Sequence, residues 1–460
     1  MKVSIDPVTR IEGHAKIAVF LSERGKVENV FFQATELRGY EKLLVGLPIE
    51  IVPRVASTIC GICRGIHFAA ALKAADRVFG VEPSETVEKI REILVLSHII
   101  EDHTITLFAL GLPDYLSPRD KSVFGVAKKL GARARDVIRS RSFALKILEV
   151  VGGKSMHPVA AVPGGWSKKI DEDERRKIEN YSRELVELGK VLVDVVENSS
   201  KDFDNVELEV NFVGTRKEGV LNFYDGEQFV VNSSGRVVEK FREKEYERVI
   251  GERSVEWSYS KVTYLKKAGW RGFVEDEHLY LVGPIARLNS AEIDTPLAKE
   301  AAEMLFSNEY PVRNVMYNHW ARAVEVLYAA EKLVEISQDK DLTRGDVRGE
   351  IGRVVGEGVG IVEAPRGLLI HHYSTDSKGI VREANIIVAT TQNNAAINVT
   401  LKKVAEKFSK RKFDKRVVEE FEKVVRAFDP CMACATHAVG RFPIEVEVWK
   451  GGKLVGRWRN

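Results

Sequence analysis

The four cysteines of this 460-residue chain form two Cys-x-x-Cys pairs at opposite ends of the sequence. The first pair lies in Cys60-Gly61-Ile62-Cys63 and the second in Cys431-Met432-Ala433-Cys434. If both pairs bind one metal centre, the whole core must fold so that the two ends of the chain meet. So few cysteines in so long a chain disfavour a secreted disulfide framework and indicate metal or redox chemistry.

The charge of the chain is nearly balanced, with 70 basic and 67 acidic residues and a formal net charge of +3. Without a strong electrostatic field, nucleic acid and anionic membranes are disfavoured as partners. The opening segment MKVSIDPVTRIEGHAKI has no signal-peptide pattern, and no later segment runs uncharged over the length of a membrane span. We therefore expect a cytoplasmic protein without a membrane span.

The hydrophobic pattern predicts an α+β fold. Apolar and polar residues alternate from His14 to Leu21 and from Val27 to Ala34, which predicts a hairpin turning at Ser22 to Gly25. Helical spacing then predicts helices over about 66 to 79, 84 to 110, 121 to 151, 171 to 198, 394 to 408 and 414 to 428. These segments indicate a central helical bundle with flanking strand regions.

Two later regions have the composition of strands. The region from about 205 to 280 is rich in turns and short alternating runs, and we expect it to be an insertion on the bundle. From Gly349 to Thr391, the runs IVEAPRGLLIHHYS and GIVREANIIVAT each predict a strand, separated by a turn at Asp376 to Gly379. We expect residues 1–437 to form one domain and residues 438–460 a C-terminal extension of two short strands around Gly451-Gly452.

Two simpler interpretations of the cysteine pairs stay open on spacing alone. Four thiolates suit a structural zinc ion, but the pairs of such sites usually lie within a few tens of residues of each other. A thioredoxin-like redox pair is less well supported, because neither pair follows the opening strand of a βαβ unit. The pattern by itself therefore indicates a metal site without fixing the metal.

Five segments narrow this choice because they occur in the order found in nickel-iron hydrogenase large subunits. They are DPVTRIEGH, RGYE, ICGICRGIH, EAPRG and DPCMACATH. The chain resembles that family from Asp6 to His437, and its length and Ile-Cys-Gly-Ile-Cys form are most similar to the cytoplasmic, coenzyme-linked group that does not reduce deazaflavin. The resemblance implies the catalytic subunit of an enzyme that oxidises dihydrogen reversibly to protons and electrons.

The resemblance also implies a role for each cysteine. Cys60 and Cys431 correspond to terminal nickel ligands, whereas Cys63 and Cys434 correspond to ligands that bridge nickel to a low-spin iron with carbonyl and cyanide ligands. Thiolates are soft donors that suit nickel. Glu12 matches the carboxylate that moves protons, although spacing alone would make it a surface glutamate.

Further site residues are implied in the same way. Arg366 resembles an arginine held above the open metal position, with Asp102 and Asp429 as the acidic residues that orient it. Thr390 and Pro365 correspond to residues that contact the cofactor. Thr390 corresponds to a residue whose hydroxyl hydrogen-bonds a cyanide ligand. Because Thr391 is adjacent, the alignment with the family is compatible with either threonine at that place.

Glu41 and His437 resemble the ligands of a separate magnesium or iron ion. A carboxylate suits a hard cation, whereas a histidine is a less usual magnesium ligand. His67 and His103 are further candidates for contacts to the metal ligands, but a histidine packed on a helix is more often structural, so neither is counted among the site residues.

The resemblance has two consequences for the assembly. A maturation endopeptidase, acting after nickel chaperones, is expected to cut after His437. The four cysteines leave no thiol for an iron-sulfur cluster, so an iron-sulfur small subunit is expected, with further electron-transfer subunits such as heterodisulfide reductase. A hydrogen-sensing regulatory subunit with low turnover is the alternative; the tail disfavours it. The metal-free quinone-site subunit of respiratory complex I lacks such cysteines.

Overall fold

The computed structural model describes residues 2–24, 26–307, 309–408, 415–436, 445–450 and 453–459. The chain opens with a three-stranded antiparallel sheet of β1 (Lys2–Ile5), β2 (Ala15–Leu21) and β3 (Val27–Ala34). The predicted β2–β3 hairpin is confirmed, with Ile17 opposite Phe32. The short strand β1, which pairs with β2, was not predicted because four residues carry too little alternation to be recognised.

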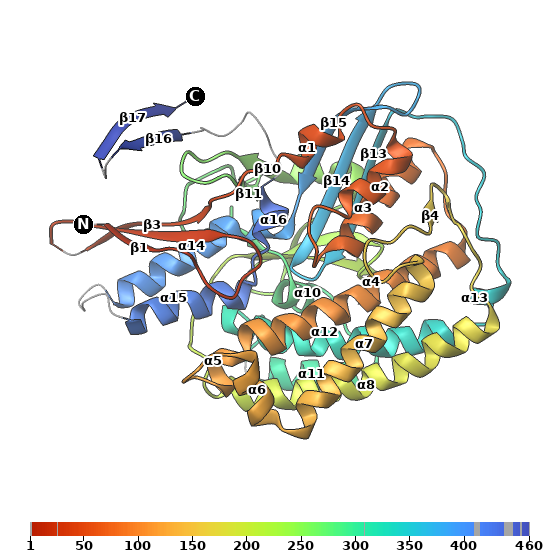
Figure 1. Ribbon diagram of the computed structural model, residues 1–460, viewed down its shortest axis with the longest axis horizontal. Coiled ribbons are helices and arrows are strands. Elements are labelled where there is room, and N and C mark those ends of the chain that lie inside the picture. Colours follow the sequence, from red (N-terminus) through yellow and green to blue (C-terminus); the bar gives the residue numbers. More distant parts are fainter. Residues whose placement is uncertain are drawn as a thin grey trace.

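Four long helices form the bundle: α4 (Glu85–Ile105), α7 (Ala132–Gly152), α8 (Glu172–Ser200) and α12 (Asn318–Gln338). Each packs against two of the others, so that they close a ring in the lower half of Figure 1. The single helix predicted over 121 to 151 is wrong. It is two helices, α6 (Val123–Leu130) and α7, because Gly131 takes a φ of +58° that breaks the helical path.

Helix α4 is the central element of the bundle. It runs into a π-helical segment, Thr106–Gly111, and then into α5 (Pro113–Leu116). The segment Glu85–Leu116 is apolar and long enough to cross a membrane by composition, but 83% of its most apolar window is buried inside the protein. It is therefore placed as the core helix of the bundle, and its apolar residues contact the neighbouring helices.

The strand-rich region predicted after residue 205 is confirmed. Its main sheet has the order β12 (Tyr280–Leu281), β6 (Asn211–Lys217), β8 (Glu227–Val231) and β9 (Val237–Phe241), with β7 (Val220–Leu221) on β6. A separate hairpin pairs β10 (Ile250–Arg253) with β11 (Val262–Leu265). The short helix α10 (Pro284–Ser290) follows β12 and packs on β6.

The third sheet consists of β13 (Glu357–Ala364), β14 (Gly367–Thr375) and β15 (Val381–Ile387). Two predictions about it are wrong. Strand structure begins at Glu357 rather than Gly349, and IVEAPRGLLIHHYS is a hairpin rather than one strand. Ala364 pairs with Gly367, so Pro365 and Arg366 form a two-residue turn between β13 and β14. Helix α3 (Arg64–Val78) covers this sheet (Figure 1).

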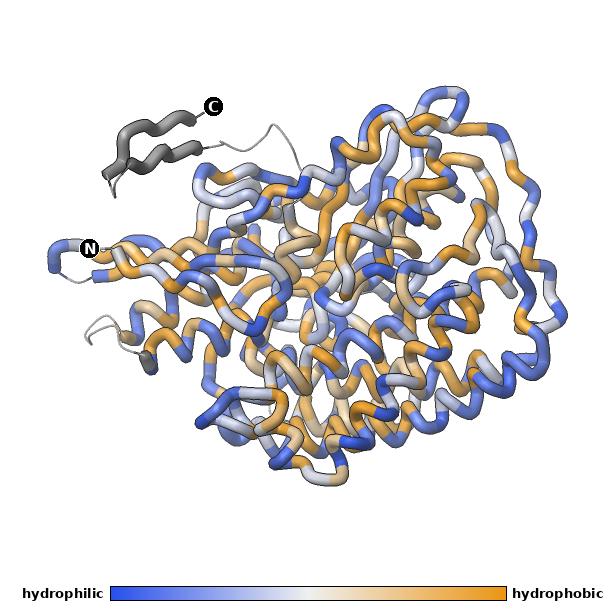
Figure 2. The backbone as a smooth tube through the Cα atoms, viewed as in Figure 1, coloured by the Kyte–Doolittle hydropathy of each residue, from blue (hydrophilic) through white to orange (hydrophobic). Residues whose placement is uncertain are grey.

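The two ends of the described core meet beside the N-terminal sheet. Helix α14 (Ala389–Lys407) packs against β3 and against α15 (Lys415–Phe428), which leads to α16 (Met432–Ala435). An isolated parallel bridge joins Glu12 to Cys431. Figure 2 shows hydrophilic residues along the outer turns and loops, whereas the central segments are mostly apolar. The remaining elements are α1 (Tyr40–Leu44), α2 (Val52–Ala56), α9 (Tyr246–Val249), α11 (Pro296–Phe306), α13 (Asp341–Arg344), β4 (Ala161–Val162), β5 (Gly165–Trp166), β16 (Glu445–Lys450) and β17 (Lys453–Arg459).

Candidate metal centre

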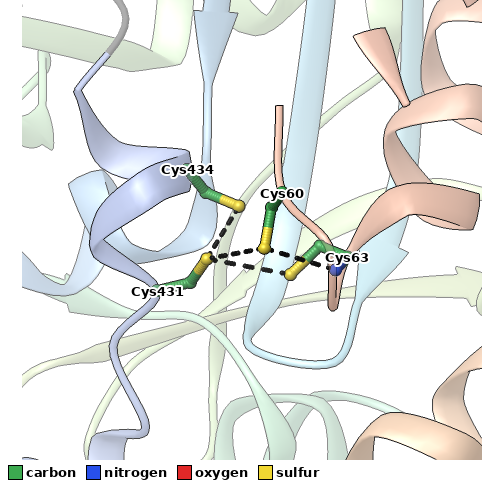
Figure 3. A group of neighbouring side chains, drawn as sticks. All are labelled: Cys60, Cys63, Cys431 and Cys434. Atoms are coloured by element: carbon green, nitrogen blue, oxygen red, sulfur yellow. Dashed lines mark hydrogen bonds between the residues drawn. The ribbon is translucent and has the colours of Figure 1, made fainter. Parts of the chain in front are cut away.

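The structure brings the four cysteines together in the core. Cys60 and Cys63 come from the loop before α3, and Cys431 and Cys434 from the N-terminal edge and body of α16 (Figure 3). Cys431 Sγ lies 3.4 Å from Cys60 Sγ, 3.9 Å from Cys63 Sγ and 2.8 Å from Cys434 Sγ. All four sulfurs lie within 4.8 Å of one another and all four residues are buried. One metal centre can therefore contact every thiol.

The first cysteine loop is held by hydrogen bonds to its backbone. The amides of Ile62 and Cys63 point at Cys60 Sγ, at 3.4 and 3.5 Å. Arg64 Nη1 donates to the Gly61 carbonyl at 2.7 Å, and His98 Nε2 lies 2.6 Å from the Ile62 carbonyl. The loop conformation that directs both thiols inward is thus fixed by residues of α3 and α4.

The protonation of the thiols depends on their neighbours. Hydrogen bonds from the Cys431 thiol, and then from Cys434 and Cys63, lower the pKa of Cys60 well below its usual range. Burial raises the pKa of Cys431 and of Cys434. A metal binds cysteines as thiolates, so a metal that binds all four sulfurs must displace the protons that burial favours on Cys431 and Cys434.

A small cavity of about 20 Å³ lies against this cluster. It is lined by Cys63, Cys431 and Cys434 but not by Cys60. The rest of its wall consists of His67, Ala364, Arg366, Leu369, Val388, Ala389 and Thr390. A closed structural zinc site uses all four ligand positions and needs no such space. The asymmetric cavity beside a buried soft-donor set fits a centre of nickel and iron better than a structural zinc ion.

Arg366 reaches the cluster from the tip of the β13–β14 turn. Its Nη1 donates to Cys63 Sγ at 3.2 Å and to Asp102 Oδ2 at 3.0 Å, and its Nε donates to the Asp429 carbonyl at 2.7 Å. Nη2 lies 3.0 Å from Asp429 Oδ2 as an ion pair. Burial lowers the pKa of Arg366, but the two carboxylates outweigh it and hold the pKa well above its usual value. The structure thus brings Asp102 and Asp429 into contact with Arg366.

The π-helical segment after α4 adds a hydrogen bond to Asp429, one of the two carboxylates that pair with Arg366. Thr106 lies at its start, and its hydroxyl donates to Asp429 Oδ2 at 3.0 Å. Burial raises the pKa of Asp429, whereas Arg366 and Arg322 act in the opposite direction. Irregular π turns within helices are frequent at functional sites. Here the irregularity places a hydroxyl on a carboxylate that pairs with Arg366.

Glu12 contacts the cluster at Cys431, whereas Arg366 contacts it at Cys63. Its Oε2 accepts from the Cys431 thiol at 3.0 Å and from the Ala433 amide at 2.9 Å, and its carbonyl accepts from the Met432 amide at 3.0 Å. Gly13 permits this close approach, because a Cβ there would lie 2.8 Å from Met432 Cβ. Burial, and then the negative Cys60, raise the pKa of Glu12. Since Glu12 is only partly buried, it lies between the cluster and the surface.

Thr390 and Pro365 lie in different positions relative to the cavity. Thr390 lines it, and its Oγ1 accepts from the Cys431 amide at 2.9 Å. Thr391 Oγ1 instead lies 3.5 Å from Ser260 Oγ, so of the two threonines only Thr390 lies against the cavity. The cavity is lined by the neighbours of Pro365, whereas the Pro365 carbonyl accepts from Arg287 at 3.1 Å.

Glu41 lies apart from the cysteine cluster. Its Oε1 accepts from the Ile386 amide at 3.1 Å and lies 4.0 Å from Lys261 Nζ. The side chain lines a surface groove of about 620 Å³ that also contains Glu252 and His372. His437, the second residue expected at this ion site, lies outside the described residues. The structure therefore supplies one of the two expected ligands.

His67 contacts the cysteine cluster directly, whereas a histidine on a helix is more often structural. Its Nε2 is 3.3 Å from Cys434 Sγ and its Nδ1 is 3.0 Å from His371 Nε2. The His371 Nδ1 in turn contacts the Tyr373 hydroxyl. Burial lowers the pKa of His67 to about 4, so the ring is neutral near pH 7. The available signal was the spacing of four residues from Cys63, which places His67 on the same side of α3.

Sequence comparisons identify related proteins along the whole chain. Residues 38–130 and 218–437 match the family described as nickel-dependent hydrogenase, and residues 2–37 match one described as HoxL-like. A protein of Archaeoglobus profundus, named as an F420-non-reducing hydrogenase iron-sulfur subunit, is 48% identical over 100% of this chain and 99% of the relative. The beta subunit of the NAD-reducing hydrogenase HoxS of Cupriavidus necator is 33% identical, over 99% and 98%.

The fold is shared with solved structures. A crystal structure of an NAD+-reducing [NiFe]-hydrogenase in the H2-reduced state superposes with a TM-score of 0.89 at 32% identity, covering 95% of this chain and 99% of that one. A [NiFeSe]-hydrogenase from Dm. baculatum superposes with a TM-score of 0.75 at 22% identity, which shows the fold alone. The expected arrangement of a helical bundle with flanking strand regions is confirmed.

Proposed function

Because this chain belongs to the nickel-dependent hydrogenase family as a catalytic large subunit with nickel and iron at its four cysteines, we propose how its residues divide the reversible oxidation of dihydrogen to protons and electrons. The observation that carries the proposal is that two ionisable side chains contact two different sulfurs of the buried group. Arg366 contacts Cys63, and Glu12 contacts Cys431. A cation and a carboxylate are the groups that heterolytic cleavage requires.

The cysteines divide into two kinds in this proposal. Cys60 and Cys431 would hold nickel alone, and Cys63 and Cys434 would be shared between nickel and an iron with carbonyl and cyanide ligands. The support is that the cavity, which leaves room for small ligands, touches both proposed bridging cysteines, although it touches Cys431 as well and only Cys60 is absent from its wall. Thr390 and Arg366 line the cavity as hydrogen-bond donors for small polar ligands, and Pro365 shapes its edge through the turn. When bound, the metals supply the electrophilic position that polarises dihydrogen and accept its electrons.

The protein residues handle the proton. Cys431 Sγ passes it to Glu12 Oε2 across 3.0 Å. The Ala433 amide, which donates to the same oxygen, keeps the Glu12 carboxylate oriented towards that sulfur. Arg366 faces the cavity with a charge that Asp102 and Asp429 make tolerable in the core. Apolar residues such as Leu369 and Val388 exclude water from this space.

The test of this function is dihydrogen-dependent reduction of a viologen dye by the anaerobically purified native complex. We expect turnover together with stoichiometric nickel. A Cys60→Ser variant removes one sulfur ligand and should lose both nickel and activity. Activity that persists in preparations without nickel would contradict the proposal. Dihydrogen binding with negligible turnover would instead support the hydrogen-sensing alternative.

We also propose a separate magnesium or iron ion at Glu41 and His437. The support is a partly buried carboxylate in a polar groove that also contains Glu252. Carboxylate oxygen is the ligand type that magnesium prefers. Elemental analysis should find this ion in the native protein, and Glu41→Gln should lose it while nickel is retained. Equal magnesium in both proteins would contradict the assignment.

An iron-sulfur small subunit is proposed as the electron acceptor. All four thiols of the chain are committed to one centre, so they leave no ligand for a cysteine-bound cluster. A groove of about 550 Å³ with a mainly apolar lining lies beside the first cysteine loop and includes Ile51, Val55 and Met156. Gly61 of that loop is exposed. A cluster docked there comes close to the metals, and we propose this surface for the small subunit.

We expect Met156→Glu to weaken binding of the small subunit by tenfold or more, because it places a charge in an apolar contact. The residue is 48% exposed, so the variant should leave the chain folded. Phe124→Glu on α6 is the matched control, because Phe124 is 86% exposed and does not line the groove. Co-purification of tagged complexes measures the difference. Equal yields of complex from both variants would contradict this docking surface.

We also propose that further electron-transfer subunits belong to the complex and that the complex lies in the cytoplasm. Electron-transfer subunits such as heterodisulfide reductase would take electrons from the small subunit, consistent with relatives named as not reducing F420. A reducing cytoplasm suits a chain whose four cysteines must stay reduced to bind metal. Purification of the native complex under anaerobic conditions should recover these subunits in the soluble fraction. Recovery in the membrane fraction alone would contradict that location.

Residues 438–460 are proposed to be removed during maturation. The family match ends at residue 437, and the solved relatives cover 95% of this chain while 99–100% of their own chains are aligned. The 23 residues after His437 amount to 5% of 460, which equals in size the share that the solved relatives leave uncovered. Intact mass spectrometry of the native, nickel-loaded protein should find His437 as the last residue. A nickel-loaded protein that retains Asn460 would contradict the proposal.

A further inference from the structure

A second group of buried charges lies directly behind the turn that carries Arg366. Arg287 of α10, Glu325 of α12 and Glu363 of β13 all have fully buried side chains. None of them touches the four sulfurs or the cavity among the contacts of the described residues. Burying three charges in a core is costly unless each is paired. The three charges are paired with one another, and Arg287 also contacts the backbone of the turn that carries Arg366.

Arg287 uses all five of its N–H groups. Nε and Nη2 donate to the two oxygens of Glu325 at 2.7 and 2.6 Å, and Nη1 donates to Glu363 Oε2 at 2.9 Å. The two remaining hydrogens go to the carbonyls of Ala364 at 2.7 Å and Pro365 at 3.1 Å. The guanidinium therefore contacts three consecutive residues, and the next residue in the chain is Arg366.

The backbone before α10 reinforces this contact. Gly283 and Gly367 face each other so closely that a Cβ on Gly283 would lie 2.7 Å from the Arg366 carbonyl oxygen. A Cβ on Gly367 would lie 2.5 Å from the Gly283 amide nitrogen. Both glycines have positive φ, at +107° and +127°. The backbone at the start of α10 therefore packs directly against the two-residue turn whose carbonyls accept hydrogen bonds from Arg287.

The carboxylates of the group are fixed in turn by other elements. Glu325 Oε2 lies 2.8 Å from His103 Nε2, and Glu363 Oε1 accepts from the Thr215 amide at 3.0 Å and its hydroxyl at 2.9 Å. His103 directly follows Asp102, whose carboxylate holds the guanidinium of Arg366. Adjacent residues of α4 thus fix both the side chain of Arg366 and, through Glu325 and Arg287, the backbone that carries it.

We propose that Arg287 is a positioning residue for the reaction, which sets the direction of the Arg366 guanidinium by holding the carbonyls of Ala364 and Pro365. The inference rests on the proposed role of Arg366 at the metal centre. A lysine at position 287 keeps the charge but has one nitrogen with three N–H groups, so it cannot span both carboxylates and both carbonyls. The turn then gains freedom, and the Arg366 guanidinium shifts relative to Cys63.

The first variant is Arg287→Lys, studied in the assembled native complex. A displacement near 1 Å at a reacting centre lowers rates by about 100-fold, so we expect kcat to fall by about 10- to 100-fold at unchanged nickel content. The infrared bands of the metal ligands should shift in the same direction as in Arg366→Lys. Arg91→Lys is the matched control, because Arg91 is a buried arginine paired with Asp76 away from the centre. It should lower the melting temperature but leave kcat and the bands unchanged.

A double-mutant cycle separates positioning from general stability. If Arg287 acts through Arg366, adding Arg287→Lys to Arg366→Lys should change kcat by less than about twofold, because coupled residues are not additive. Multiplied losses, or an Arg287→Lys kcat and spectrum equal to wild type, would overturn the inference. If Arg287→Lys does not assemble, Glu363→Gln replaces it with the same two criteria. Full activity of Arg366→Lys alone would instead overturn the proposed role of Arg366.

Discussion

Replacing Glu12 by glutamine is expected to lower the rate of dihydrogen oxidation by a factor of about 10² to 10⁴, the usual contribution of a positioned acid or base. Glutamine keeps the shape of the side chain, and its amide oxygen can still accept from the Ala433 amide. It cannot take a proton from Cys431 Sγ, which lies 3.0 Å from the carboxylate. All four sulfurs remain, so nickel and iron contents should not change.

Dye reduction under dihydrogen measures this loss, and metal analysis of the same samples shows whether the centre is intact. Glu36→Gln is a suitable control, because Glu36 pairs with the exposed His14 at the surface rather than with a cysteine. It should keep wild-type activity. A Glu12→Gln enzyme that retains more than about a third of wild-type turnover would exclude Glu12 as the main proton acceptor.

The pH dependence of the wild-type enzyme provides a second readout of Glu12. Burial raises its pKa above the usual value of 4.5, and Glu12 must be deprotonated to accept a proton. The rate of dihydrogen oxidation should therefore fall as the pH falls through this raised pKa. The loss should occur at a higher pH than an exposed glutamate would give, and Glu12→Gln should abolish this limb of the profile.

The change Arg366→Lys is expected to reduce turnover by about 100-fold, because it displaces a charge that the reaction needs in one place. Three nitrogens of Arg366 contact Cys63, Asp102 and both the carbonyl and the carboxylate of Asp429. A single ammonium group cannot make these contacts together. Its charge still balances the buried carboxylates, so the fold and the metal content should persist.

Comparison of kcat with the Michaelis constant for dihydrogen shows where the loss arises. We expect the fall mainly in kcat, since Arg366 faces the reaction rather than the surface. Asp102→Asn serves as a graded control, because it removes one of the two carboxylates on Arg366 and should cause a smaller loss. Unchanged turnover in Arg366→Lys, with nickel retained, would show that the guanidinium has no part in the reaction.

Local patterns were enough to predict the cysteine centre and the bundle. Cys-x-x-Cys pairs and amphipathic runs such as 171 to 198 are encoded in neighbouring residues, so they can be recognised without tertiary information. The hairpin at Pro365-Arg366 was missed because apolar residues continue on both sides of it. The sheet is buried there, so no run of exposed polar residues marks the turn, and the charged residues at it, Glu363 and Arg366, are themselves buried.

The contacts that hold the site are mostly non-local and could not be predicted. Arg287 meets Glu363 across 76 positions, and His67 meets Cys434 across 367. The sequence around Arg287, ARLNSAE, carries no signal that distinguishes it from a surface arginine. Only the packing of α10 against the β13–β14 turn makes this side chain a fully buried cation with five hydrogen bonds.

The most direct test of a nickel-iron centre at Cys60, Cys63, Cys431 and Cys434 is an infrared spectrum of the anaerobically purified native complex. We expect bands of metal-bound carbonyl and cyanide that shift when dihydrogen is added. Such bands arise from ligands that a structural zinc site does not carry. A spectrum without them, in a protein that contains stoichiometric zinc, would contradict the account and return the four cysteines to a structural role.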